Sequence, residues 1–252
     1  MHIITISNQK GGSGKTSVTV NLAASLAEQK KRVLVIDLDP QASTSAWLKC
    51  QSDAKGLYDV FVENISISGI ITKTRFNGLD VIPASPWLIG ADKTLSMEAG
   101  AELLLKGHLK KLKKEWDYCL IDTPPALGLL TLNALSASSS VLIPVETRIM
   151  ALQGLMQLTK TIQTVRERLN PDLEILGVLA CRVDKRTRLS QDVMHELKNR
   201  LGDKLLPLHI RESVKIAEAP SFCEPIIYYD KKGAGAEDFR ALAKLIIKRG
   251  KQ

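Results

Sequence analysis

Short apolar runs alternate along the chain with longer amphipathic segments. The runs are rich in Val, Ile and Leu at nearly every position, a pattern that is typical of strands covered on both faces. This alternation predicts an α/β fold, a doubly wound, mostly parallel sheet with helices on both faces. The predicted strands are residues 3–7, 33–37, 79–83, 118–122, 141–145, 175–181 and 206–210, and the predicted helices are 16–29, 91–114, 127–137, 151–169, 187–201 and 234–249.

The same pattern continues along the whole chain without a linker-like stretch. The 252 residues, 44% of them hydrophobic, are enough to bury a full core. We therefore predict a single domain over residues 1–252. The segment from 49 to 78 is the least regular, and we expect a surface excursion there.

The spacing of the cysteines and the hydropathy of the chain indicate the cellular compartment. No uncharged apolar run reaches the roughly 18 residues that a membrane-spanning helix needs. The cysteines are widely separated and form no Cys-x-x-Cys pair. We therefore predict that they are reduced thiols. We expect a cytoplasmic protein. The four cysteines are Cys50, Cys119, Cys181 and Cys223.

The chain is basic, with 35 Lys and Arg against 27 Asp and Glu and a formal net charge of +8. Residues 185–252 hold 15 of the basic and 9 of the acidic side chains. A basic C-terminal end favours nucleic acid or an anionic membrane surface as a partner. An ordinary solvated face is the alternative that charge alone leaves open.

The first predicted strand leads into a glycine-rich loop, SNQKGGSGKTS, at residues 7–17. A loop between a strand and a helix presents unpaired backbone N–H groups and the positive end of the helix dipole, and both attract anions. The glycines let the backbone close around phosphate oxygens, Lys15 reaches the β- and γ-phosphates, and Thr16 offers its hydroxyl to Mg²⁺. The predicted phosphate-binding residues are Gly11, Gly12, Ser13, Gly14, Lys15, Thr16 and Ser17.

Two further strands end in acidic residues. Asp37 and Asp39 lie two positions apart after one strand, and Asp122 ends the strand YCLID. Ligands bind at the carboxyl ends of strands in a doubly wound sheet, so we expect these carboxylates beside the glycine-rich loop. They suit a hydrated Mg²⁺ and an attacking water. A turn-capping role for Asp39 and a plain strand-end role for Asp122 are the alternatives.

Together these motifs resemble those of the ParA family of chromosome and plasmid partitioning ATPases. The loop reads KGGSGKT, with Lys10 at its head and Gln9 where the strict phosphate-loop pattern needs glycine,. The sequence DLDPQ ends the second strand, and TPPALGLLTLNAL follows Asp122. The resemblance covers nearly the whole chain. It implies a P-loop ATPase of the deviant Walker A type that uses ATP and Mg²⁺.

The resemblance also implies which residues act in catalysis. In that family the lysine at the head of the loop reaches the nucleotide of a second subunit. Lys10 therefore predicts an ATP-dependent homodimer, in which Lys10 and Lys15 neutralise phosphate charge. Asp39 is expected to orient or activate the attacking water.

Further roles follow from the same resemblance. Thr16 and Asp122 are expected to hold Mg²⁺, with Asp37 supporting a metal-bound water. Asp184 and Pro220 are expected beside the adenine base, where Cys181 replaces a hydrogen-bonding side chain of some relatives. Arg148 replaces a glutamate that many relatives carry, and it is either a solvated arginine or a contact to the partner subunit or DNA.

The basic residues near the C-terminal end are candidates for DNA contact. No helix-turn-helix and no aromatic platform accompany them, so binding to duplex DNA would rest on phosphates and lack sequence preference. We therefore expect no operator-specific repressor role. For each of these residues an ordinary solvated charge is the alternative. The predicted DNA-binding residues are Arg186, Arg188, Lys215, Lys248 and Arg249.

The family resemblance also implies partners and a place of action. A ParB-type centromere-binding protein is expected to stimulate hydrolysis, and the dimer is expected to associate with the nucleoid. A membrane-cycling ATPase of the MinD kind is the main alternative, because the C-terminal segment places Phe239, Leu242, Leu245 and Ile246 on one side of a helix,. An enzyme of the dethiobiotin synthetase kind, or an iron–sulfur reductase like the nitrogenase iron protein, fits less well. The reductase needs a cysteine after the Asp122 loop, and this segment has none.

Overall fold

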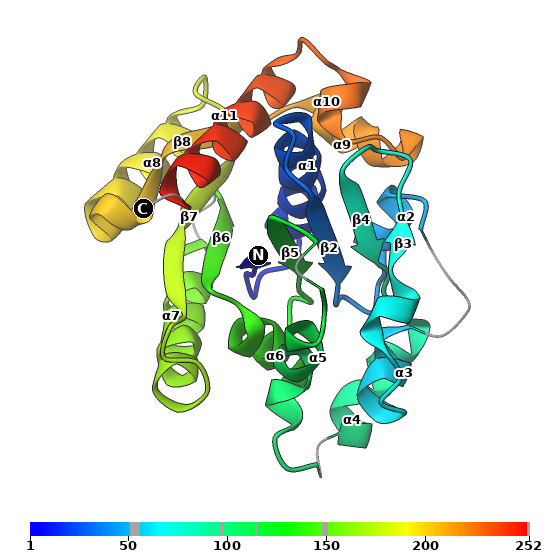
Figure 1. Cartoon of the computed structure of the whole chain (residues 1–252). Helices are drawn as coiled ribbons and strands as arrows, with labels where there is room; N and C mark the ends of the chain where they lie inside the picture. The colour runs from blue at the N-terminus through cyan, green and yellow to red at the C-terminus, as the bar shows by residue number, and fades with distance from the viewer. Residues whose placement is uncertain (51–55, 96–97, 114, 148–150, 251–252) are drawn as a thin grey trace.

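An eight-stranded sheet runs through the centre of the molecule (Figure 1). The computed structural model describes residues 1–50, 56–95, 98–113, 115–147 and 151–250, so Arg148 lies outside the described residues. The strand order is β3-β4-β2-β5-β1-β6-β7-β8, and all pairings are parallel except that of β3 with β4. The strands are β1 (His2–Ile6), β2 (Val33–Asp37), β3 (Thr72–Lys73), β4 (Leu79–Ile82), β5 (Tyr118–Asp122), β6 (Ser140–Glu146), β7 (Glu174–Val183) and β8 (Leu205–Arg211).

The predicted doubly wound, mostly parallel sheet is confirmed, and each of the seven predicted strands is present. β3 was not predicted because it consists of two exposed residues without an apolar pattern. The helices are α1 (Lys15–Glu28), α2 (Ser43–Trp47), α3 (Leu57–Val62), α4 (Ala91–Leu95), α5 (Leu104–Lys110), α6 (Leu129–Ala137), α7 (Ala151–Arg168), α8 (Arg188–Leu201), α9 (Val214–Glu218), α10 (Ile226–Tyr229) and α11 (Ala234–Arg249).

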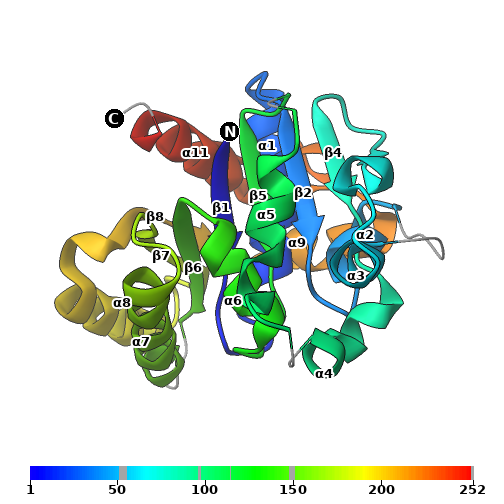
Figure 2. The same cartoon turned by 60° about the horizontal axis from the view of Figure 1, so that its bottom comes forward.

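Helices cover both faces of the sheet, because successive residues of a strand point to opposite faces. In β2, Val33 and Val35 belong to the core beneath α1 and α11, whereas Leu34 and Ile36 belong to the core beneath α3, α5 and α6. α7 and α8 extend the second layer over β6 and β7 (Figure 2). This double coverage explains why the strands are apolar at nearly every position.

The segment 91–114, predicted as one helix, is two helices with a turn between them. Gly100 has a φ of +76°, a left-handed conformation that no helix continues. Leu103 N donates to the Gly100 carbonyl within this turn, and α5 begins at the next residue. The apolar spacing resembles a single helix because α4 and α5 both bury their apolar residues in the same core.

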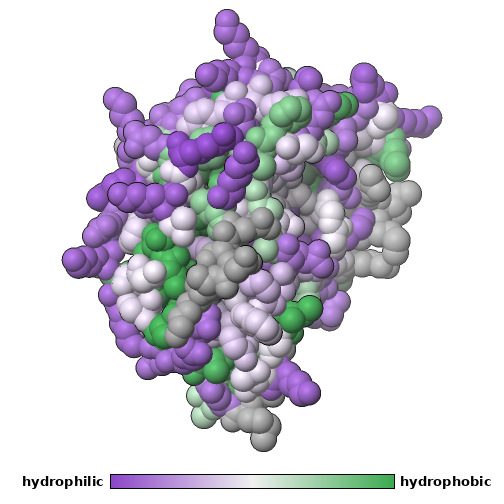
Figure 3. All heavy atoms as spheres, turned by 90° about the vertical axis from the view of Figure 1, so that its right-hand side faces the viewer, coloured by the Kyte–Doolittle hydropathy of each residue, from purple (hydrophilic) through white to green (hydrophobic). Residues whose placement is uncertain are grey.

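The predicted surface excursion also needs a correction. Its described residues are 49–50 and 56–78; the second stretch contains α3, a 3₁₀ turn and β3, and Leu57, Val60 and Phe61 are buried in the core beneath α3. The molecule seen from the side of β3 and β4 is largely hydrophilic, with separate small apolar areas (Figure 3). The segment therefore contributes to the core as well as to the surface.

Strand register places the candidate site at one edge of the sheet. Ile6 at the end of β1 lies opposite Asp122 at the end of β5, and Asp122 lies opposite Asp37 at the end of β2. The loops that follow these three strands therefore converge at the carboxyl edge, where open α/β sheets bind their ligands.

Candidate nucleotide-binding site

The glycine-rich loop connects β1 to α1 at this edge. Gly12 and Gly14 have φ values of +75° and +90°, in a left-handed region that costs other residues about 1–2 kcal/mol. Gly14 precedes Lys15, the first residue of α1, so the unpaired N–H groups of the helix N-terminus lie beside the loop. The backbone therefore has the geometry of an anion site.

Lys15 is buried in this loop, with 7% of its surface exposed, and its Nζ lies 3.5 Å from the Lys10 carbonyl oxygen. Burial lowers the pKa of Lys15, and the carboxylates of Asp122 and Asp39 oppose that shift. Lys10 itself is only partly buried. The two lysines therefore differ in setting: one is fixed inside the site and the other reaches the surface.

The Asp122 carboxylate is fully buried at the end of β5. The hydroxyls of Thr16 and Thr44 both donate to its Oδ2, each at 2.8 Å. Its Oδ1 is also buried and has no hydrogen-bond partner among the described residues. A buried acceptor without a partner costs about 1–3 kcal/mol, and a water bound to Mg²⁺ would supply the missing donor. Thr16 and Asp122 therefore fit a hydrated magnesium ion.

A self-contained metal cage does not occur in the described part of the chain. No group of three or more His, Cys, Asp or Glu side chains is placed there to hold a metal. Mg²⁺ usually keeps several waters and binds through one or two protein oxygens together with substrate phosphates. The Thr16 and Asp122 site suits a metal of this kind.

Asp37 and Asp39 have different surroundings although they are two residues apart. Asp37 is fully buried, and its Oδ2 accepts from the backbone N and the hydroxyl of Ser45 at 2.8 and 2.7 Å. Its Oδ1 accepts from Asp39 N at 3.2 Å. The Asp39 carboxylate accepts from Gln41 N at 3.0 Å and lines the cavity over the glycine-rich loop. Asp37 thus holds the turn that presents Asp39, and the metal role predicted for Asp37 stays a prediction.

The two buried carboxylates are costly to ionise. Burial raises the pKa of Asp37 to about 7, with the neighbouring Asp122 charge adding to the effect. Burial likewise raises the pKa of Asp122 to about 6. A carboxyl whose pKa is raised by folding binds more protons in the folded state. Its contribution to stability is therefore present at low pH and declines as the pH rises from about 4 to about 7.

We expect Asp122→Asn to become more stable than the wild type as the pH rises from 5 to 7.5 without nucleotide. The expected gain is on the order of 1–3 kcal/mol, because the variant removes a carboxyl whose pKa burial raises to about 6,. The measurement is denaturant unfolding of both proteins at several pH values. The variant is compared with the wild type at each pH because burial also lowers the pKa of His2, His108 and His209. These histidines make both proteins more stable as the pH rises, and the difference between the two proteins cancels their effect. A stability difference that does not change with pH would contradict the expectation.

Two cavities that share lining residues lie along the loop. One, of about 450 Å³, is lined by residues 11–17 together with Asp39 and Pro125. The other, of about 250 Å³, extends past Ile216 to Pro220 and has a more apolar lining. Three residues line both cavities, namely Gly14, Ser17 and Arg182. A nucleotide with its phosphates in the first cavity would place its base in the second.

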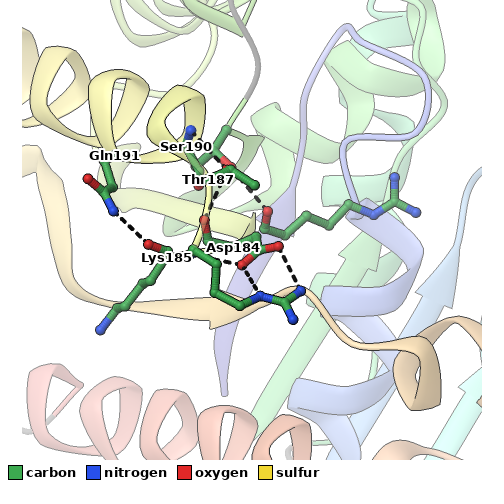
Figure 4. Close-up of polar contacts among 8 residues, drawn as sticks. Asp184, Lys185, Thr187, Ser190 and Gln191 are labelled. Carbon is green, nitrogen blue, oxygen red and sulfur yellow. Dashed lines mark hydrogen bonds and ion pairs between the residues drawn. The ribbon is translucent and has the colours of Figure 1, made fainter.

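The two residues predicted beside adenine differ in position. Pro220 lines the second cavity, as does Cys181. Asp184 lines neither of the two cavities just described, and its carboxylate accepts from the Arg186 guanidinium at 2.9 and 2.9 Å and from Arg186 N at 3.0 Å (Figure 4). This hydrogen bonding lowers the pKa of Asp184 to about 2. Base contact by Asp184 stays a prediction.

Four of the five predicted DNA-binding residues fall into two pairs. Arg186 and Arg188 follow the carboxyl end of β7, whereas Arg249 donates to the carbonyl of Leu176 near the start of that strand. The length of β7 between them, about seven residues, corresponds to roughly 23 Å. Lys248 is exposed beside Arg249. The structure therefore brings the first pair to the carboxyl edge and leaves the second pair at the opposite end.

Ion pairs further distinguish these cations. Arg186 is paired with Asp184, and Lys215 is paired with Glu218 at 3.0 Å. Arg188 is exposed, and no ion pair holds it within the described ranges. Of these three cations, Arg188 is therefore the best placed to contact a phosphate without first releasing a carboxylate.

Two residues of the site were missed from the sequence. Thr44 donates to Asp122 from α2, and Arg182 lies at the junction of the two cavities. Thr44 follows Gln41, the last residue of the DLDPQ motif, by three positions, so its hydroxyl was a detectable signal. For Arg182 no motif gave a signal, although Asp184, two positions further on, is predicted beside adenine.

The chain matches known proteins over most of its length. Residues 1–175 match the family described as an AAA domain. The chain is 45% identical over 250 residues to the sporulation initiation inhibitor protein Soj of Bacillus subtilis, which covers 98% of this chain and 99% of Soj. It is 41% identical over 249 residues to the chromosome partitioning protein ParA of Myxococcus xanthus, covering 98% and 88% of the two chains.

One solved structure with a similar fold is not named as a partitioning protein. It is cobyrinic acid a,c-diamide synthase from Mycobacterium smegmatis with bound ADP and magnesium, with a TM-score of 0.87 and 32% identity. The match covers 100% of this chain and 96% of that one.

Proposed function

The chain belongs to the ParA family of chromosome and plasmid partitioning ATPases, and we propose that it is an ATP-dependent homodimer that holds DNA and hydrolyses ATP. The reaction is ATP + H₂O → ADP + phosphate, with Mg²⁺ as the cofactor. One observation supports it above all: buried Lys15, the Thr16 hydroxyl and the unpartnered Asp122 Oδ1 meet beside the loop, with Asp39 lining the same cavity.

Each of these groups has a distinct task in the proposed reaction. Lys15 and the loop N–H groups balance the charge of the β- and γ-phosphates. Thr16 and Asp122 hold Mg²⁺, which supplies further positive charge to the phosphates when it is bound. Asp39 orients the attacking water and accepts its proton, because its carboxylate lines the phosphate cavity on a turn fixed by Asp37. Lys10 is the lysine that reaches the nucleotide of the second subunit.

Nucleotide exchange then acts as a switch for DNA. A single patch of a few cations binds duplex DNA weakly, with non-specific Kd values of about 10⁻⁴ to 10⁻⁶ M. A dimer presents two patches at once, which raises avidity without any new contact. DNA is held by the ATP-bound dimer and released after hydrolysis, and a ParB-type partner would set the timing by stimulating hydrolysis. Nucleoid association is part of this proposal.

The membrane-cycling alternative loses its main support. The apolar side of α11 packs against α1 and β8, and Phe239, Leu242 and Ile246 are at most 1% exposed. These side chains are unavailable to a lipid surface unless the helix leaves the core. None of the helices in the described ranges has the length and apolar content needed to span a bilayer.

Removing Arg188 tests the DNA-binding surface. We expect Arg188→Ala to weaken non-specific DNA binding and to reduce the salt slope by about 1.8, because a dimer would lose two phosphate contacts of about 0.9 each. Fluorescence anisotropy on a random-sequence duplex, at several salt concentrations with ATP, measures both quantities. Arg249→Ala is the matched control and should leave the slope unchanged, because Arg249 donates to the Leu176 carbonyl at the far end of β7. Equal slopes for Arg188→Ala and the wild type would contradict the assignment.

The oligomeric state tests the proposed function itself. Sedimentation velocity of the Asp39→Ala protein should show a dimer with Mg²⁺ and ATP and a monomer with Mg²⁺ and ADP. Lys10→Ala in the same background should remain a monomer with either nucleotide. A single oligomeric state in all four conditions would overturn the nucleotide-controlled dimer.

A further inference from the structure

Arg182 lies where the two cavities meet, and the proposed reaction assigns it no task. It lines both the cavity over the glycine-rich loop and the cavity that extends to Pro220. Its side chain is 49% exposed, and its Nη1 donates to Glu146 Oε1 at 2.6 Å. Glu146 is 5% exposed at the end of β6, opposite Cys181 of β7. A buried carboxylate thus holds a half-exposed guanidinium at the junction.

The backbone keeps Arg182 in this place although its conformation is unusual for arginine. Its φ is +55°, within the left-handed region that non-glycine residues seldom adopt. The Thr147 hydroxyl donates to the Arg182 carbonyl at 3.1 Å, and Thr147 N donates to the neighbouring Cys181 carbonyl at 3.3 Å. Such conformations persist where the surrounding structure fixes them, and they cluster at ligand sites.

We propose that Arg182 is a further nucleotide-binding residue, which contacts the α-phosphate within its own subunit. The inference rests on the proposed binding of ATP in the two cavities. If the base occupies one cavity and the β- and γ-phosphates occupy the other, the ribose and α-phosphate must cross the junction that Gly14, Ser17 and Arg182 line. A guanidinium offers five donors in a planar fork. Glu146 engages Nη1, which leaves donors for a phosphate oxygen.

The other arginine of the second cavity is unsuited to this task. Arg211 donates through Nε and Nη2 to Asp238, and through Nη2 also to Glu237 and the Ala234 carbonyl. Two carboxylates therefore offset its charge. Arg182 has one such carboxylate, Glu146, which acts as its positioning residue.

The α-phosphate contact makes a specific prediction about nucleotide affinity. Because ATP and ADP share the α-phosphate, Arg182→Met should weaken both by the same factor, about tenfold for a lost hydrogen bond to a charged group. The double variant Arg182→Met/Glu146→Gln should show a similar loss for both nucleotides. The double variant removes the positive charge of Arg182 and the negative charge of Glu146 together. A loss of affinity in this variant therefore cannot come from repulsion between the phosphates and a Glu146 carboxylate that no longer contacts Arg182. Arg182→Lys, which keeps the charge, should lose less.

The test is isothermal titration of the wild type and these variants with ATP and with ADP, in the presence of Mg²⁺. Arg200→Met is the matched control, because Arg200 is exposed near the end of α8, is paired with Glu196 on the same helix, and lines neither of the two cavities. It should bind both nucleotides like the wild type. Wild-type affinity for both nucleotides in the double variant would overturn the inference. A loss of affinity for ATP but not for ADP would also overturn it, because it would place the Arg182 guanidinium at the γ-phosphate. If the wild type itself failed to bind either nucleotide, the proposed function would fail instead.

Discussion

The Asp39→Ala protein is expected to bind Mg²⁺ and ATP about as tightly as the wild type and to hydrolyse ATP at least about 100-fold more slowly, the range typical of a lost general base. The substitution leaves the glycine-rich loop, Lys15 and the Thr16–Asp122 contact in place. It removes the carboxylate that lines the phosphate cavity on the turn after β2. Phosphate release under saturating ATP measures the rate, and titration calorimetry measures the affinity.

Gln41→Ala is the control for this result. Gln41 lines the same cavity, and its backbone N–H, which the substitution keeps, donates to Asp39. Its turnover should stay within about threefold of the wild type, a difference of about 0.6 kcal/mol, because Gln41 is exposed and the substitution keeps both the Asp39 carboxylate and the N–H that donates to it. Hydrolysis by Asp39→Ala at the rate of Gln41→Ala would remove Asp39 from the reaction.

The Lys15→Ala protein is expected to lose affinity for both ATP and ADP by at least about 30-fold, because truncating one member of a buried charge cluster costs about 2–5 kcal/mol. Lys15 is 7% exposed, and the carboxylates of Asp122 and Asp39 are close enough to raise its pKa against the effect of burial. Without this ammonium, the phosphates would face those carboxylates directly. Titration calorimetry of each nucleotide measures the loss.

Lys10→Ala is the matched lysine variant. Lys10 is only partly buried, and its proposed contact is to the nucleotide of the other subunit. The monomer should therefore bind ADP within about threefold of the wild type, a difference of less than 1 kcal/mol. Equal losses in the two lysine variants would contradict the separate tasks assigned to them.

The sheet was predictable from sequence because its strands are covered on both faces, which makes β2 and β5 apolar without interruption. The same rule failed for β3, whose residues Thr72 and Lys73 are exposed. It also merged α4 and α5, because the apolar spacing continues through the turn at Gly100 while the backbone does not. Periodicity reports which face is buried, and it does not report whether the backbone between two buried residues stays helical.

Local motifs predicted the loop, Asp39 and Asp122, because each follows a strand that ends at the same sheet edge. Contacts between distant segments were beyond such motifs. The Thr44 hydroxyl reaches Asp122 across 78 positions, and Arg182 reaches Glu146 across 36. The basic residues show the opposite case: the sequence groups them in one basic C-terminal end, but Arg186 follows the carboxyl end of β7 and Arg249 contacts Leu176 near its start. Side chains that meet through the sheet require its register, which the sequence pattern alone does not supply.

The nucleotide switch for DNA is the central claim, and the Asp39→Ala protein tests it most directly. This protein should be titrated onto a fluorescent random-sequence duplex with Mg²⁺ and ATP, and again with Mg²⁺ and ADP, at two salt concentrations. We expect tight DNA binding with Mg²⁺ and ATP but not with Mg²⁺ and ADP. The logarithm of the binding constant should fall with the logarithm of the salt concentration at a slope of about −3.6, for about four phosphate contacts per dimer. Equal affinity with ATP and ADP would contradict the account.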